Sequence, residues 1–399
     1  MEDTESLSTM AALSMSRRRF LAASSGTFVA LLPSLARFTG AQPPLAGGQF
    51  VRMLPLGDPL RPDDPPLNRL LGTALDARLF TDLSRLARGD MITPNDRFFV
   101  RTACPKEVGA VRPWTIALGG RVRRPQRISA DALFRLAAPM GTHLLECAGN
   151  TNPNNYGLMS AARWDGVPIG ALLDRARPLS GVSHLRITGV DDEQFPSRTS
   201  TPGASWIFSR DDLERAQAFL ATRMNGAPLP RHHGAPVRLV VPGWYACTCI
   251  KWVNAIEFVP DDVGATSHME EFAARTHQSA DARLAREFAP AVIDVAATPI
   301  RVEQWDILGR PMYRIVGVVW GGSTPAQALQ IRFRTGEPWT NISDYRRPAT
   351  TATWSLWSHQ WQPAEAGRYH LVVRVKDPAV RTRRLDLFFY IRAVDITDV

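Results

Sequence analysis

The sequence predicts an α+β protein in which a mixed α/β domain precedes an all-β sandwich. A chain of 399 residues is too long for one ordinary domain, so two are expected. From about residue 96 to 262, short strand patterns alternate with short helical ones. After about residue 290 only short alternating strand patterns remain, separated by turn residues, which is typical of a sandwich.

The N-terminal segment, residues 1–41, has the organisation of an export signal. "SRRRFLAASSGTFVALLPSLA" contains an arginine cluster, a short apolar stretch and a small-residue end. Its Ser-Arg-Arg-x-Phe-Leu order resembles a twin-arginine signal, which predicts a periplasmic or otherwise exported protein. A basic N-terminal helix of a cytosolic protein is the alternative. No segment reaches the ~18 apolar residues needed to span a bilayer.

Residues 42–95 are rich in proline, as in "RPDDPPLNRL". We expect a wrapping arm there, with one short helix near residues 71–86. The mixed domain, residues 96–285, should then supply five strands, at "WTIALGGRV", "THLLECAGN", "HLRITGV", "APVRLVVPG" and "WVNAIEFV".

Three helices are expected in the same domain. "SADALFRLA" has Ser129 at the N-cap position, "IGALLDRA" follows, and "SRDDLERAQAFLATRMNG" should be a helix ended by Gly226. No G-x-G-x-x-G opens a helix after a strand, which argues against a dinucleotide site. Residues 268–289 should be helical or irregular.

The C-terminal domain, residues 286–399, is expected to be all-β. Its strands are predicted at "TPIRVEQW", "MYRIVGVVWGG", "ALQIRFRTG", "TWSLWSHQWQ", "GRYHLVVRVKD" and "RRLDLFFYIRAV".

Charge and cysteine content exclude several classes of protein. The formal charge is +9, but the arginines are scattered and no basic run is interleaved with aromatic residues, so we expect no nucleic-acid partner. The four cysteines form no CxxC pair, no haem-attachment motif and no disulfide framework.

Cys147, in "HLLECAGNTNPNN", lies at the end of a predicted strand. By itself it could be a small buried hydrophobe, a nucleophile or a thiolate ligand for a soft metal. Glu146 should point away from it, as a neighbouring strand residue does, and has no expected catalytic role.

Several cations and glycines accompany this cysteine in the mixed domain. "DRFFVRTACP" holds Arg101, and "MNGAPLPRHHGAPVRLVVPGWYACTCIKW" holds His233, Arg238 and Lys251. Together they suggest a thiolate site beside a large anion, such as a pterin dithiolene whose phosphate is held by cations and by backbone N–H groups. Ordinary salt bridges remain the alternative for Arg101 and Arg238. His232 is expected to be a solvated loop residue.

These motifs, in this order over roughly residues 90–399, resemble the sulfite oxidase family of molybdopterin enzymes. The resemblance implies a molybdenum–molybdopterin cofactor, with Cys147 as the single protein ligand of the metal. It implies that Arg101, His233, Arg238 and Lys251 bind the pterin or line the pocket, with Arg101, Cys147 and Lys251 acting in catalysis. It also implies that the C-terminal sandwich is an immunoglobulin-like dimerisation domain.

The chain departs from the family pattern near the substrate site. Thr151 and Asn152 follow C-A-G-N where animal and plant sulfite oxidases have arginine, and "HMEEFAARTHQ" offers Phe272 and His277 but no tyrosine. Thr102, Ala103 and Cys104 stand where the family often has Asn-His. Two further cysteines, Cys247 and Cys249, are expected to be strand residues facing one way, with a second metal site as the alternative.

The resemblance implies oxygen-atom transfer to sulfite or a related sulfur oxyanion, with electrons passed to an external carrier such as a cytochrome c. Reduction of S- or N-oxides such as methionine sulfoxide is the alternative, and a non-catalytic exported binding protein is the second one. A homodimer is also expected, because a small sandwich core should not bury all the tryptophans that its segment carries. These are Trp305, Trp320, Trp339, Trp354, Trp357 and Trp361.

Overall fold

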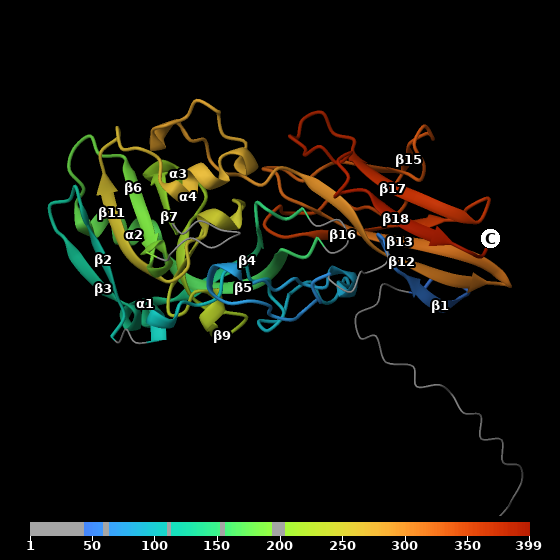
Figure 1. Ribbon diagram of the computed structural model, residues 1–399, viewed down its shortest axis with the longest axis horizontal. Helices are drawn as coiled ribbons and strands as arrows, with labels where there is room; N and C mark the ends of the chain where they lie inside the picture. Colours follow the sequence, from blue (N-terminus) through green and yellow to red (C-terminus); the bar gives the residue numbers. More distant parts are fainter. Residues whose placement is uncertain (1–43, 59–63, 110–112, 152–155, 194–203) are drawn as a thin grey trace, which may run out of the picture. The chain divides into compact units, whose positions relative to one another are not determined.

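A computed structural model of the protein describes residues 44–58, 64–109, 113–151, 156–193 and 204–399. The predicted export segment, residues 1–41, lies outside these ranges, as does Asn152. The described part is mostly β, with eighteen strands and four short α-helices (Figure 1).

One five-stranded sheet of the N-terminal half carries the predicted strands around "WTIALGGRV" and "WVNAIEFV". In spatial order it contains β3 (Gln126–Ser129), β2 (Thr115–Gly120), β11 (Val253–Val259), β6 (His184–Gly189) and β7 (Ser205–Ser209). The pair β2–β11 is parallel and the other pairs are antiparallel.

A second, antiparallel sheet carries the strand that leads to Cys147. Its strands are β10 (Arg238–Val240), β8 (Phe219–Met224), β5 (Met159–Pro168) and β4 (Ala138–Glu146), with β9 (Ala227–Pro228) paired to β8. The two sheets share one apolar core that includes Trp164, Trp206 and Trp252. The last residue of β4 is therefore held on a rigid platform.

The helices of this half are short. They are α1 (Ala130–Leu136), α2 (Ile169–Ala176), α3 (Arg210–Arg215) and α4 (Ser267–Phe272). The predicted cap of α1 is confirmed, because the Ser129 side chain accepts a hydrogen bond from Ala132 N at 3.2 Å. No helix in the described ranges is both long enough and apolar enough to cross a bilayer.

The long helix predicted over residues 209–226 is wrong in its second half. Helix α3 ends at Arg215, and the chain then forms β8 at the centre of the second sheet. Phe219, Leu220 and Ala221 are consecutive and fully buried. A strand buried on both faces reads as a continuous apolar run, which periodicity alone cannot distinguish from a buried helix.

The C-terminal half contains two four-stranded antiparallel sheets that contribute to one apolar core. The first has the order β1 (Gly48–Leu54), β12 (Ala296–Ile307), β13 (Arg310–Trp320) and β16 (Ser355–Trp361). The second has the order β15 (Thr340–Asn341), β14 (Leu329–Arg332), β17 (Gly367–Val375) and β18 (Arg392–Ile396). An immunoglobulin-like topology for them remains a prediction.

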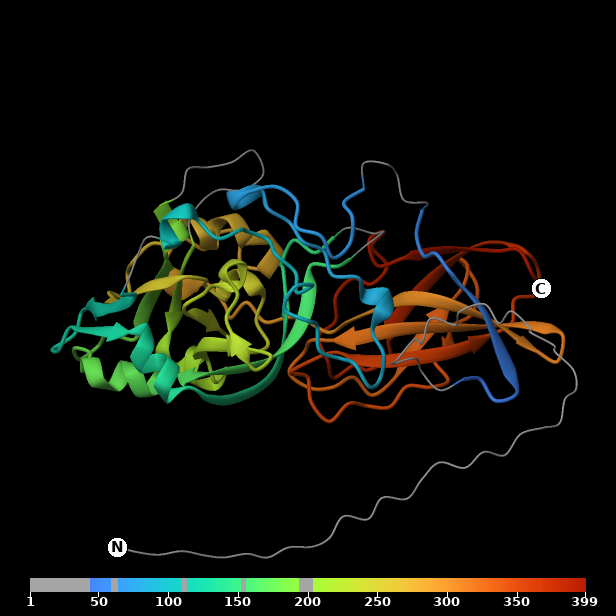
Figure 2. The same ribbon diagram turned by 90° about the horizontal axis from the view of Figure 1, so that it is seen from below.

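The Pro-rich arm differs from its prediction in two ways. No α-helix forms over residues 71–86, where the structure has only the 3₁₀ turns η1 (Ala74–Asp76) and η2 (Leu83–Arg85). The arm instead begins with β1, which pairs antiparallel with β12 at the edge of the C-terminal sheet (Figure 2). A sheet edge offers unpaired backbone groups, so an extended segment gains hydrogen bonds there that a helix would not.

Two expectations for the C-terminal half are also corrected. The strand predicted at residues 383–394 begins only at Arg392, because the preceding residues form turns. Of the six tryptophans, Trp339 alone is half-buried, and the others are between 0% and 8% exposed within the chain itself. Tryptophan content therefore gives no support to a subunit interface, and the homodimer stays a prediction.

Candidate active site

Cys147 directly follows β4 and is buried, with 5% of its surface exposed. The backbone N–H of Gly149 donates to its Sγ at 3.4 Å. Burial raises the pKa of this thiol, while Arg101, the Gly149 amide, Arg275 and Arg78 lower it. Three guanidinium groups therefore act on one sulfur atom.

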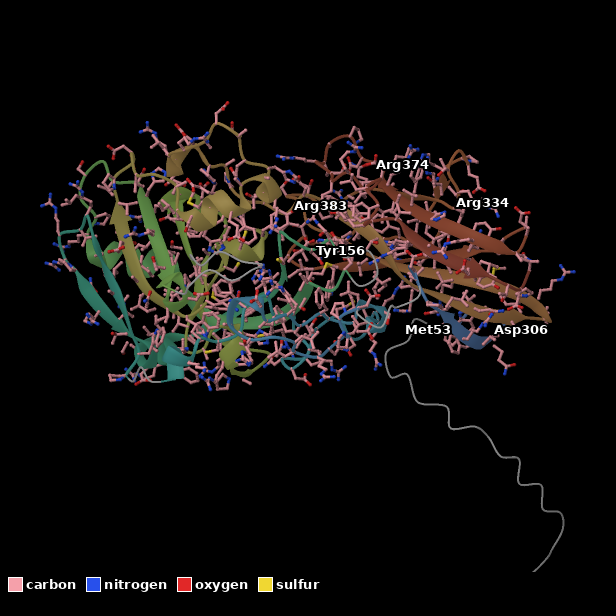
Figure 3. All side chains as sticks on the ribbon, viewed as in Figure 1. Met53, Tyr156, Asp306, Arg334, Arg374 and Arg383 are labelled. Atoms are coloured by element: carbon pink, nitrogen blue, oxygen red, sulfur yellow. The ribbon has the colours of Figure 1, made fainter. Side chains whose placement is uncertain are left out.

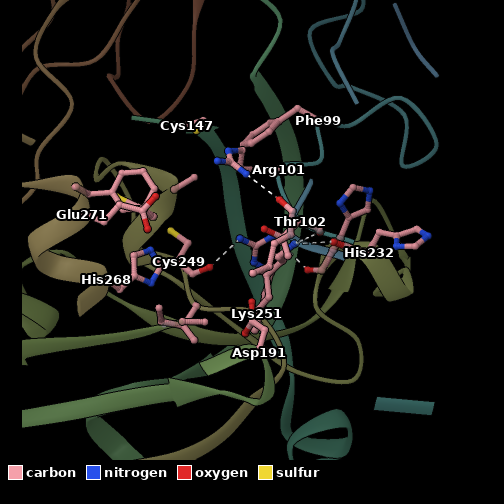
Figure 4. A pocket seen from close by; sticks show the side chains of 18 of the residues that line it. Phe99, Arg101, Thr102, Cys147, Asp191, His232, Cys249, Lys251, His268 and Glu271 are labelled. Atoms are coloured by element: carbon pink, nitrogen blue, oxygen red, sulfur yellow. Dashed lines mark hydrogen bonds between the residues drawn. The ribbon is translucent and has the colours of Figure 1, made fainter. Parts of the chain in front are cut away.

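Arg78 and Arg101 are held together by backbone carbonyls. Arg78 Nη1 donates to the carbonyls of Leu75 at 2.8 Å and Arg101 at 2.7 Å, and Arg101 Nη1 donates to Leu75 at 3.1 Å. Burial lowers the pKa of Arg78 to about 10, and it also lowers the pKa of Arg101. The two cations are thus fixed in place by the irregular loop around η1. Figure 4 shows Arg101 in the same pocket as Cys147.

Arg275 reaches the same sulfur from the turn η7 (Ala274–Thr276), just after α4. A Cβ placed on Gly149 would lie 3.4 Å from Arg275 Nη1 and 3.7 Å from Cys147 Sγ. Because residue 149 has no side chain, no atom of it separates the Arg275 guanidinium from the Cys147 thiol.

A second group of cations comes from the segment that ends at Lys251. The turn η5 (Arg231–His233) closes on Gly234, whose φ of +108° suits glycine. A Cβ at this position would lie 2.8 Å from Arg238 Cβ and 3.3 Å from Lys251 Cβ, so the absence of a side chain lets these residues approach.

Arg238 is 4% exposed and forms no ion pair among the described residues. Its Nη1 donates to the His233 carbonyl at 3.2 Å and its Nη2 to the Cys249 carbonyl at 3.0 Å, while its buried Nε has no hydrogen-bond partner in the described ranges. Burial lowers the pKa of Arg238 to about 10. A buried cation in this state is stabilised by an anion.

Lys251 and His233 complete the group. Lys251 Nζ donates to the carbonyls of Thr102 at 2.5 Å and His232 at 3.2 Å, and burial lowers its pKa to about 7, although Asp191 opposes the shift. His233 Nε2 lies 2.9 Å from the Asn95 carbonyl, and burial lowers the pKa of His233 to about 3. His233 is therefore a neutral donor at pH 7.

All five predicted site residues line one pocket of about 840 Å³, a volume that includes its open part (Figure 4). Apolar side chains, including Phe98, Phe99 and Phe272, form much of its wall, and Glu271 and His268 lie on the same wall. The structure thus brings Arg101, Cys147, His233, Arg238 and Lys251 together.

Two expectations for the surrounding residues are wrong, and the alternative of a second metal site is not supported. His232 is a half-buried pocket residue whose Nδ1 accepts a hydrogen bond from Cys104 N at 3.0 Å, not a solvated loop residue. Cys247 lies in the turn η6 (Ala246–Thr248) and Cys249 directly follows it, so neither is a strand residue, and both line the pocket. Within the described residues no group of three or more His, Cys, Asp and Glu side chains could hold a second metal.

Sequence reasoning missed Arg78 and Arg275. Arg78 was hidden in a segment predicted to be helical. Arg275 lies within "HMEEFAARTHQ", close to Phe272, and its charge in that segment was the available signal.

Part of the chain, which includes Cys147, Arg238 and Lys251, matches a known family model. Residues 102–267 match the family model described as "Oxidoreductase molybdopterin binding domain". The chain is similar to the catalytic subunit of protein-methionine-sulfoxide reductase of Xanthomonas axonopodis pv. citri, with 29% identity over 209 residues, which cover 49% of this chain and 63% of that protein. It is also similar to sulfite oxidase of Gallus gallus, with 28% identity over 302 residues, covering 69% of this chain and 64% of the relative.

The chain thus spans less than two thirds of the length of either relative. Among solved structures, the sulfane dehydrogenase SoxCD from Paracoccus pantotrophus shares the fold at a TM-score of 0.59. The identity is 18%, and the match covers 93% of this chain and 96% of that one.

Proposed function

The chain belongs to the sulfite oxidase family of molybdenum-dependent oxidoreductases, and on that premise we propose that it oxidises sulfite or a related sulfur oxyanion and passes the electrons to an external carrier. Members of this family are enzymes with a molybdenum–molybdopterin cofactor, so a non-catalytic binding protein is disfavoured. The observation that carries the proposal is the buried Cys147 thiol facing three arginine side chains.

The residues of the pocket fit the cofactor that the family implies. Cys147 is a single soft ligand, as expected for a metal that already carries sulfur from its pterin. The buried Nε of Arg238 has no partner in the described ranges, and burial lowers the pKa of Lys251, so an anionic group such as a phosphate would stabilise both cations. The cofactor supplies two-electron redox chemistry when bound.

The chain's own residues then bind, orient and exclude water. Cys147 would hold the metal, with its sulfur fixed by the Gly149 N–H. Arg238, Lys251 and the neutral His233 would hold the pterin and its phosphate from the opposite segment. The phenylalanines of the wall would keep bulk water away from the charges, which strengthens each electrostatic contact.

Substrate binding is assigned to the arginines around Cys147. Arg101, Arg78 and Arg275 would together balance the charge of a bound oxyanion. They would take the role of the arginine that animal and plant sulfite oxidases have after C-A-G-N and that this chain lacks. In the proposed reaction sulfite gains one oxygen from water and releases two protons and two electrons as sulfate forms. The electrons would leave to a carrier such as a cytochrome c.

Reduction of sulfoxides is the second candidate. Similarity to the protein-methionine-sulfoxide reductase supports it, as does the apolar wall of Phe98, Phe99 and Phe272, which suits a thioether. Two assays separate the candidates. Sulfite with cytochrome c or ferricyanide tests the oxidation, and methionine sulfoxide with reduced viologen tests the reduction. Turnover in the second assay alone would replace our first candidate with the second.

Cys147→Ser tests the metal site itself. We expect the variant to lose bound molybdenum and all turnover, because a hydroxyl is a poor ligand for a sulfur-bound metal. Metal analysis of the purified protein is the measurement, and Cys104→Ser, a half-buried thiol outside the pocket lining, is the control. Full molybdenum content in Cys147→Ser would remove Cys147 as the ligand.

Export through the twin-arginine pathway to the periplasm belongs to the same proposal. It rests on "SRRRFL" in the segment before the described residues. Replacing Arg17 and Arg18 by lysine should leave the protein in the cytoplasmic fraction. Processing and export at the wild-type level would contradict the pathway.

A further inference from the structure

A second cavity lies far along the chain from Cys147, between the N-terminal arm and the C-terminal strands. It encloses about 1050 Å³, including the part open to solvent. Most of its lining is apolar: Met53 and Leu54 from β1, Leu56 and Leu83 from the arm, and Ile300 from β12. Met53, one of the lining residues, is labelled in Figure 3. Nothing in the proposed reaction uses this cavity.

Arg392, at the start of β18, lines the cavity and is only 4% exposed. Its Nε and Nη1 are buried and have no hydrogen-bond partner in the described ranges. Burial lowers the pKa of Arg392 to about 10, and Tyr156, whose ring lies 5.8 Å from the guanidinium carbon, is the single opposing influence on it. Among the described residues, no carboxylate forms an ion pair with Arg392.

Arg301, the other arginine that lines the cavity, has a carboxylate partner for its charge. Arg301 Nε donates to Glu303 at 2.7 Å, and its Nη1 donates to the Leu86 carbonyl at 2.6 Å and the Ser84 carbonyl at 3.0 Å. Burying a cation without such partners destabilises the fold. An anion at Arg392 would recover much of that cost.

The cavity also limits the charge and shape of the anion. Asp58 and Asp82 lie on its lining and would repel a group with two or more negative charges. Their own partners are Arg368 and Arg85. A carboxylate carries one charge, and the guanidinium of Arg392, which lines the cavity, would attract it. The apolar lining would cover a hydrocarbon tail.

We propose that this cavity binds an aliphatic monocarboxylate, with the carboxylate on Arg392 and the tail against the apolar side chains of the arm and Ile300. None of its lining residues lines the pocket around Cys147, and the proposal does not rest on the proposed function.

Octanoate is the probe that tests the site. Isothermal titration of the holoenzyme should show saturable binding of octanoate. Acetate lacks the tail, octanol lacks the charge, and octyl phosphate carries more negative charge than a carboxylate. Each of these three should therefore bind at least ten-fold more weakly than octanoate. Arg392→Met should weaken octanoate binding at least ten-fold while molybdenum content stays unchanged. Arg52→Met, an exposed arginine on β1, is the matched control and should bind as the wild type does.

A second variant covers the case in which Arg392→Met fails to fold. Leu56→Trp fills the cavity from the arm without touching the charge, and it should also abolish octanoate binding. The absence of saturable binding to the wild type would overturn the proposal. Equal binding by Arg392→Met would do so as well, and octanol binding as tightly as octanoate would show that the charge plays no part.

Discussion

At the scale of single residues, the main feature of the pocket is a set of cationic side chains that the protein itself buries. Arg238 and Lys251 donate to backbone carbonyls, and burial lowers the pKa of each. Burial also lowers the pKa of Arg78 and of Arg101 beside Cys147. Such a pocket is costly when empty of anions and gains stability on binding them.

Lys251 makes the stability of the cofactor-free protein depend on pH. Its folded pKa is about 7 and its unfolded value 10.5, so between these pH values the unfolded chain binds one more proton. The free energy of unfolding should therefore fall as pH falls from 10.5 to 7, by at most about 1.4 kcal/mol per pH unit, and level off below. Thermal melts at pH 7, 8 and 9 measure it.

Lys251→Met should flatten this dependence, whereas the exposed Lys376→Met should not. Cofactor loading should flatten it too, since a nearby anion raises the lysine pKa. An unchanged slope in Lys251→Met would assign the dependence to another group.

Arg275 is expected to bind substrate directly. Arg275→Gln should raise the KM for sulfite about five-fold, corresponding to about 1 kcal/mol for a charged contact at an exposed site, with molybdenum content unchanged. Arg286→Gln, an exposed arginine of the turn η8 (Ala285–Glu287), is the control. Loss of kcat at an unchanged KM would instead indicate a role other than binding.

At the scale of elements, the end of β4 is tied to the C-terminal half of the chain. Glu146 is fully buried and accepts hydrogen bonds from both Nη atoms of Arg383, at 2.8 and 2.6 Å, and from Trp320 Nε1 at 2.8 Å. Arg383 Nη1 also donates to the Tyr156 hydroxyl at 3.3 Å, and both residues are labelled in Figure 3. Glu146, expected to have no catalytic role, thus anchors the strand that presents Cys147.

Breaking the Glu146–Arg383 ion pair should lower the stability of the fold far more than breaking an ion pair at the surface. Glu146→Gln leaves the Arg383 charge buried, so we expect a loss of about 3 kcal/mol and a clear drop in melting temperature. The exposed neighbour Arg384→Met, which loses its pair with Asp386, should change little.

The double variant Glu146→Gln/Arg383→Met removes both charges and should recover part of the loss. A single Glu146→Gln as stable as the wild type would show that the pair does not hold β4 in place.

At the scale of the whole molecule, a homodimer remains our prediction from the family resemblance. The tryptophan argument for it fails, because most of these rings fill the core of the chain's own sheets. Exposed Leu387 and Phe388, at 39% and 69%, are apolar side chains that a partner could cover. Light scattering at micromolar concentration should give the mass of two chains, and a mass near 44.1 kDa would remove the prediction.

Much of the pocket could be predicted from the sequence, because its key residues occur in short contiguous motifs. Cys147 precedes a glycine turn, and Gly234 lies within a few residues of His233 and Arg238. Local patterns of this kind also predicted helices α1 and α2 with their start positions. They failed at β8, where a strand at the centre of a sheet has the same apolar run as a buried helix.

The sequence by itself therefore determined the C-A-G-N motif and the cations that accompany its thiol, and it predicted that only strands follow about residue 290. Only the tertiary structure showed that Arg78 and Arg275 reach Cys147, that the arm forms β1 on β12, and that Glu146 pairs with Arg383 across 237 positions. The physical reason is that these contacts depend on how the sheets pack. No local spacing records which distant arginine will face a given carboxylate or thiol.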